Sequence, residues 1–61
     1  MNKFFIGQYV KLNTEDEWNS SYGMITSLIN NIIIIFCMNK PEYNYFVKYE
    51  EADKILEIIN V

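Results

Sequence analysis

The chain of 61 residues has no histidine and no arginine, and it has a single cysteine. Without histidine it lacks the side chain that most often acts as a general base near neutral pH. One thiol cannot form a disulfide within the chain, and without histidine or a second cysteine a structural zinc site is not expected. Cys37 lies in an apolar run, where we expect a buried, inert thiol. These absences predict a protein that is not an enzyme and that uses no metal and no cofactor.

Positive charge is also scarce. The net charge is −3, and the five lysines are scattered along the chain. Proteins that bind nucleic acid usually gather basic residues, with arginines that contact phosphates or base edges. The composition therefore disfavours nucleic acid as a partner.

Long hydrophobic runs are missing as well. No apolar stretch approaches the ~20 residues that a membrane-spanning helix needs. Gly7, Gln8 and Lys11 interrupt the apolar core that a secretory leader would require. A single cysteine favours a reducing compartment. We therefore expect a cytoplasmic protein with no membrane contact.

The small size makes stability the first problem for this chain, which we expect to form one domain over 1–61. A chain this short buries only about 60% of the surface that its unfolded form exposes. Small scaffolds usually gain stability from disulfides, a metal or oligomerisation. The single cysteine excludes a disulfide within the chain, and the lack of histidine argues against a metal. A very apolar core or self-association remains, and the 51% of hydrophobic residues suits both.

The chain is rich in β-branched and aromatic residues, and its few turn-forming residues divide it into strands. Asn30-Asn31 predicts a tight hairpin turn because asparagine tolerates a positive φ, and Asn39 with Pro41 marks the next turn. A helix over 50–60 remains an alternative to the last strand, because its apolar residues also fit one helical face. We expect five strands, over 8–13, 23–29, 32–36, 43–49 and 54–61, with a single 3-10 or helical turn near 50–53.

This pattern resembles the SH3-like barrel superfamily, in particular its KOW-like and small bacterial or phage members. The resemblance implies an all-β fold, a small five-stranded antiparallel barrel. It does not extend to the peptide-binding members, because their Ala-Leu-Tyr-Asp-Tyr segment and paired tryptophan are absent. The residues that carry it are Gly7, Val10 and Leu12, then Gly23, Ile25 and Leu28, then Asn30-Asn31 with Ile33 and Ile35, and the segment 49–58.

The isoleucine run is the sharpest feature of the sequence. Alternate residues of a strand point to opposite faces, so Ile32, Ile34 and Phe36 share one face while Ile33 and Ile35 share the other. Whichever set points inward, an apolar stripe is left outside. Burying each such side chain is worth roughly 1.5–3 kcal/mol. We expect a homo-oligomer or a protein complex formed through Ile32, Ile34 and Phe36, or else a cover provided by the loop 13–21 or the segment 1–6.

Two further groups are candidate contact residues. The acidic Glu15, Asp16 and Glu17 beside Trp18 would suit a basic protein partner, because tryptophan is frequent among interface hot spots. The alternative is a solvated loop whose tryptophan folds back onto the domain. A divalent cation would need more oxygen ligands than this loop offers.

The fourth strand carries a row of tyrosines at one parity. Tyr43 and Tyr45 share it with Tyr49, while Phe46 points to the opposite face. Tyrosines suit a half-wet protein interface, ordinary packing, or stacking on bases.

The sequence as a whole predicts a small, non-catalytic protein-binding module that self-associates through an apolar strand face. Its size and acidity fit a phage or mobile-element factor that binds and inhibits a host protein. The alternative is a KOW-type barrel that binds nucleic acid or a nucleotide through its tyrosine row.

Overall fold

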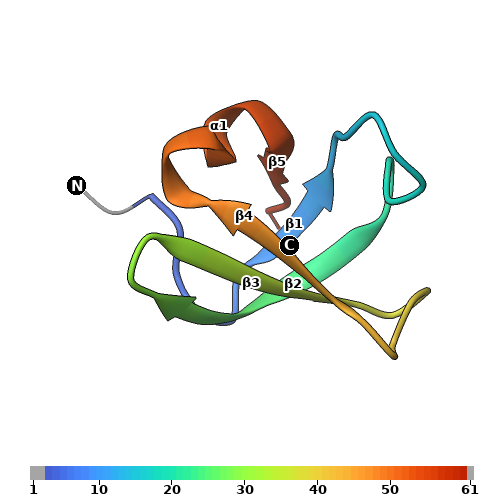
Figure 1. The fold of residues 1–61 in the computed structure, drawn as a ribbon, viewed down its shortest axis with the longest axis horizontal. Coiled ribbons are helices and arrows are strands. Elements are labelled where there is room, and N and C mark those ends of the chain that lie inside the picture. Colours follow the sequence, from blue (N-terminus) through green and yellow to red (C-terminus); the bar gives the residue numbers. More distant parts are fainter. Residues whose placement is uncertain (1–2, 61) are drawn as a thin grey trace.

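The computed structural model describes residues 3–60, which form one antiparallel sheet of five strands in the order β4-β3-β2-β1-β5. Figure 1 shows that the sheet is strongly twisted and that the helical segment lies above it in this view. The predicted all-β class and strand number are confirmed. The elements are β1 (Tyr9–Leu12), β2 (Tyr22–Ile29), β3 (Ile32–Cys37), β4 (Asn44–Lys48), the 3-10 helix η1 (Tyr49–Glu51), α1 (Ala52–Ile55) and β5 (Leu56–Ile58).

The five-stranded sheet is not closed, and β4 and β5 are its two edges. η1 and α1 carry the chain from one edge to the other. The helical part is therefore longer than the predicted turn at 50–53, and β5 is shorter than the predicted strand at 54–61, whose last residue lies outside the described residues. The cause is tertiary: Ala52 is fully buried, and the carbonyl of Ile55 accepts a hydrogen bond from Asn13 N at 2.7 Å.

The β2–β3 hairpin has the tight turn that the sequence predicts. Ile29 pairs with Ile32, so Asn30 and Asn31 form a two-residue loop, and Asn30 has a φ of +55°. Such loops require positive φ, which asparagine adopts at low cost. The register shifts once along this hairpin, between Ile25 and Ser27.

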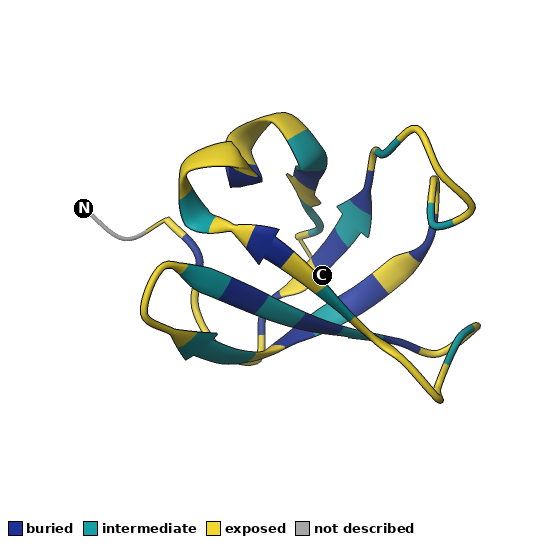
Figure 2. Cartoon of the chain, in the orientation of Figure 1, coloured by how far each residue is buried: buried dark blue, intermediate teal, exposed yellow. Residues whose placement is uncertain are grey.

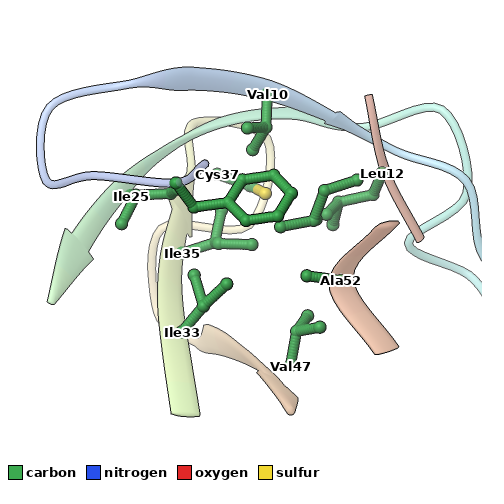
Figure 3. Close-up of a cluster of buried hydrophobic side chains, with 10 residues drawn as sticks. Val10, Leu12, Ile25, Ile33, Ile35, Cys37, Val47 and Ala52 are labelled. Carbon is green, nitrogen blue, oxygen red and sulfur yellow. The ribbon is translucent and has the colours of Figure 1, made fainter. Parts of the chain in front are cut away.

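The core lies on the concave side of the sheet. Figure 3 shows its aliphatic side chains converging from all sides on a space closed by Ala52 of α1. Phe4 joins this cluster and meets the ring of Tyr49 edge-on, with the ring centroids 5.8 Å apart. The buried hydrophobic residues are Phe4, Val10, Leu12, Ile25, Ile33, Ile35, Cys37, Val47, Ala52 and Leu56.

Gln8 is a buried polar residue. It shares the inward parity of Val10, and its side-chain amide is used by the segment before it. Gln8 Oε1 accepts from Phe5 N at 3.4 Å, and Gln8 Nε2 donates to Lys3 O at 3.5 Å. Because a buried amide is costly without partners, these bonds fix the start of the chain against the sheet.

Candidate protein-binding face

The convex side of the sheet, called here the outer face, is largely apolar. It follows from strand alternation, since directly paired residues point to the same side. Ile34 pairs with Phe46 on one side of β3, and Met24 pairs with Phe36 on the other. The apolar members of the outer face are Tyr9, Tyr22, Met24, Ile29, Ile32, Ile34, Phe36, Phe46 and Ile59.

The isoleucine run divides between the core and the outer face. Ile33 and Ile35 are fully buried, while Ile32, Ile34 and Phe36 are half-buried on the outer face. The dark blue and teal bands along β3 in Figure 2 show this alternation. Phe4 enters the core, Phe5 is exposed and Trp18 packs against Tyr45. Residues 1 and 2, which belong to the other expected cover, lie outside the described residues.

A groove of about 440 Å³ crosses one half of the outer face, between β1, β2 and β3. This volume lies within the range of ~300–1,000 Å³ typical of ligand-binding clefts. No lining side chain is charged. The lining residues are Tyr9, Val10, Tyr22, Gly23, Met24, Phe36, Met38 and Ile59.

Charged side chains stand at the margins of this face. Lys11 pairs with Glu57 across β1 and β5, and Lys48 lies at the end of β4. Lys11 Nζ lies 5.9 Å from the ring centroid of Tyr22. The other acidic residues belong to the loops and to the η1–α1 segment. An apolar, aromatic centre inside a polar rim is the usual anatomy of a protein interface.

The predicted tyrosine row is not a single surface. Tyr45 is half-buried on the inward parity of β4, Tyr43 lies in the turn before that strand, and Tyr49 begins η1 and packs on Phe4. The chain leaves the strand conformation at both ends of β4, so the period of two does not extend to Tyr43 or Tyr49.

Asp16 fastens the loop 13–21 to the rest of the protein. Its Oδ1 accepts from Thr14 Oγ1 at 2.5 Å and from Trp18 N at 2.9 Å, and its Oδ2 accepts from Tyr45 OH at 3.2 Å. The hydrogen bond from Thr14, followed by those from Trp18 and Tyr45, holds the pKa of Asp16 below its ordinary value. Burial first, and then this carboxylate, raises the pKa of Tyr45.

The other residues of the acidic group are placed differently from Asp16. Glu15 is exposed, and Glu17 Oε1 lies 3.9 Å from Lys40 Nζ. The same Lys40 nitrogen lies 5.6 Å from the ring of Trp18, which packs on Tyr45 with the ring centroids 5.1 Å apart. Trp18 and Asp16 therefore hold the loop in place, Glu17 is paired with Lys40, and Glu15 is exposed.

The one cysteine and the acidic side chains were the candidates for reactive or metal-binding groups in this chain. Cys37 is buried opposite Gly23, and burial raises the pKa of its thiol, so the reactive thiolate is disfavoured. Residues 3–60 hold no group of three or more histidine, cysteine, aspartate or glutamate side chains placed to bind a metal ion.

Comparisons with known proteins leave the site to be judged on its own geometry. The chain matches no protein-family model, and neither curated proteins nor solved structures gave a significant match. Within residues 3–60, no helix has the length and apolar character needed to cross a membrane.

Sequence reasoning missed most of the groove. It found Phe36 but not Tyr9, Tyr22 or Met24, and it treated Phe46 only as a residue opposite the tyrosines. A signal was present, because Tyr22 and Met24 alternate with Gly23 and Ile25 along β2. What the sequence lacked was the order of the strands, which brings these side chains together.

Proposed function

We propose that this protein is a non-catalytic protein-binding module that self-associates through its outer face. The observation that carries the proposal is the continuous apolar surface centred on Ile34 and Phe36, which has charged residues only at its margins. Exposed apolar patches of this kind on small soluble domains mark interaction sites.

A second copy of the chain is the partner that best fits this surface. The net charge is −3, yet the centre of the outer face has no acidic residue, so two copies can approach there without direct repulsion between carboxylates. A standard interface buries about 800 Å² on each partner, about a fifth of the 4426 Å² that the chain exposes. Because domains of this size are marginally stable alone, burying that area also stabilises the fold.

The strand order and the helical turn before the last strand support the proposed resemblance to SH3-like domains. A fold of this class does not specify a function, so the proposal rests on the face itself. A nucleotide-binding role is not favoured, because Tyr43, Tyr45 and Tyr49 do not lie on one surface.

The proposal is tested by Ile34→Glu in sedimentation equilibrium over a range of concentrations. Ile34 lies between Phe46 and Ser27 on the outer face, so a carboxylate there would lose its hydration in a dimer. We expect the wild type to be dimeric and Ile34→Glu to be monomeric, with unchanged far-ultraviolet circular dichroism.

Two controls accompany this experiment. Ile34→Val keeps the apolar character and should remain dimeric, and Tyr43→Glu places a carboxylate at an exposed position outside β4 and should also remain dimeric. A wild type that sediments as a 7.3 kDa monomer at millimolar concentration would show that the self-association proposal is wrong.

A further inference from the structure

We infer that, in the dimer, Phe46 of each copy inserts into the groove between β1, β2 and β3 of the other copy. This inference rests on the proposed self-association and specifies how the two outer faces meet. Its basis is that the protruding side chain of Phe46 and the apolar groove lie on the same face.

Phe46 protrudes from the edge of the outer face. Its side chain is 62% exposed, and the next outward residues along β4, Asn44 and Lys48, are polar. Among the described residues, the other exposed aromatic side chains on strands are Tyr9 and Tyr22, and both are walls of the groove. Phe46 is therefore the ring that this face offers to a partner.

The groove lies toward the opposite edge of the sheet. The strand order β4-β3-β2-β1 places β3 and β2 between Phe46 and the β1 side of the groove. When a second copy is laid face to face on the first, a two-fold axis can lie in the plane of the interface, midway between Phe46 and the groove. This axis brings Phe46 of each copy opposite the groove of the other. Both insertions then form together, as an isologous contact requires.

The chemistry of the groove suits a phenyl ring. Tyr9, Tyr22 and Phe36 offer aromatic contacts, and Met24 and Met38 offer sulfur–aromatic contacts from flexible side chains. Because neither the ring nor the lining is charged, insertion removes no ion from water. Lys48 and Asn44 stay beside the inserted ring, at the rim, where water can reach them.

The direct test is an isotope-filtered nuclear Overhauser experiment on a dimer mixed from labelled and unlabelled wild-type copies. We expect contacts between the ring protons of Phe46 in one copy and the ε-methyl groups of Met24 and Met38 in the other. Loss of these signals in Phe46→Leu assigns them, because the chain has three other phenylalanines.

A matched pair of substitutions gives the affinity test. Phe46 and Tyr43 are similarly exposed, at 62% and 66%, but Tyr43 lies outside the strand. We expect Phe46→Ala to weaken dimerisation by at least about 30-fold, as for a hot-spot residue, and Tyr43→Ala to leave it within about twofold. Because both positions are exposed, both variants should still unfold in a single cooperative transition on heating.

The possible outcomes separate this inference from the proposed function. A monomeric wild type overturns both. A dimer that loses affinity with Ile34→Glu but not with Phe46→Ala, or whose Phe46 ring contacts residues outside the groove, keeps the proposed function and overturns the insertion.

Discussion

Gly23 is the position where a single methyl group should do the most damage. It faces inward on β2, between Val10 of β1 and Cys37 of β3. A Cβ atom placed there would lie 2.6 Å from the carbonyl oxygen of Phe36, 2.7 Å from Cγ2 of Ile35 and 2.8 Å from Sγ of Cys37. Two of these atoms belong to side chains, but the oxygen is backbone and can move only if β2 and β3 separate.

We expect Gly23→Ala to cost about 1–3 kcal/mol, the usual range for overpacking a core. A domain of this length has a total stability of about 3–9 kcal/mol, taking ~0.05–0.15 kcal/mol for each residue. The substitution should therefore lower the melting temperature by about 5–20 °C. Adding Cys37→Ala should restore little, because the clash with the carbonyl of Phe36 remains.

Gly7 provides a comparison in which the cause is different. A Cβ atom there meets nothing within 4 Å, but the φ of Gly7 is +94°, which L-residues avoid. Gly7→Ala should cost about 1–2 kcal/mol through backbone strain. Asparagine tolerates positive φ better than alanine does but is larger, so Asn should be milder than Ala at position 7 and worse than Ala at position 23.

Urea denaturation at one fixed protein concentration, followed by tryptophan fluorescence and circular dichroism, measures the stability of all five variants. The fixed concentration matters because the proposed dimerisation would stabilise the folded state by mass action. If Ala and Asn rank in the same order at both positions, or if Gly23→Ala costs less than about 0.5 kcal/mol, then β2 and β3 are not packed as closely as described here.

Two further predictions concern the loop 13–21. Ser20 has a φ of +69°, so Ser20→Gly should stabilise the protein by about 0.5–1 kcal/mol in urea denaturation, and a loss of stability would contradict the strain. The pKa of Asp16 is lowered in the folded state. The stability that Asp16 contributes is therefore present above its ordinary pKa of 3.8 and is lost as the pH falls through the lowered value. The pKa of Tyr45 is raised in the folded state. The stability that Tyr45 contributes is therefore present below its ordinary pKa of 10.0 and is lost as the pH rises through the raised value. In a plot of melting temperature against pH, Asp16→Asn should flatten the acid limb and Tyr45→Phe the alkaline limb, with Cys37→Ala as the background so that the thiol does not titrate. Unchanged limbs would mean that the hydrogen bonds accepted by Asp16 and the burial of Tyr45 do not persist in solution.

Local signals account for the parts of the fold that the sequence predicted. The alternation of Val10 and Leu12 around Lys11, and the isoleucine run itself, identify strands because the side-chain period of a strand is two. The Asn30-Asn31 turn could be predicted because its conformation depends on the two residues that occupy it. None of these features needs knowledge of distant neighbours.

The parts that were missed depend on distant neighbours. The apolar pattern of the segment 52–58 fits both a helix and a strand. In the structure the helix ends at Ile55 and the strand begins at Leu56, because Ala52 enters the core and Leu56 pairs with Leu12. Trp18 folds back onto Tyr45, in line with one of the two alternatives that the sequence offered, but the hydrogen bond from Tyr45 to Asp16, 29 residues away, has no local signal. The groove likewise needs three strands in a particular order.

The edges of the sheet bear on which kind of assembly the apolar outer face would form. Edge strands can pair with other chains and lead to open assemblies. Here β5 has three residues, and β4 has five and ends at Lys48, whose charge disfavours continuation of the ladder. A head-to-tail contact between β4 and β5 would repeat without closing, whereas a contact between two outer faces closes after two copies. Short or charged edges beside an apolar face therefore favour a closed dimer over a filament.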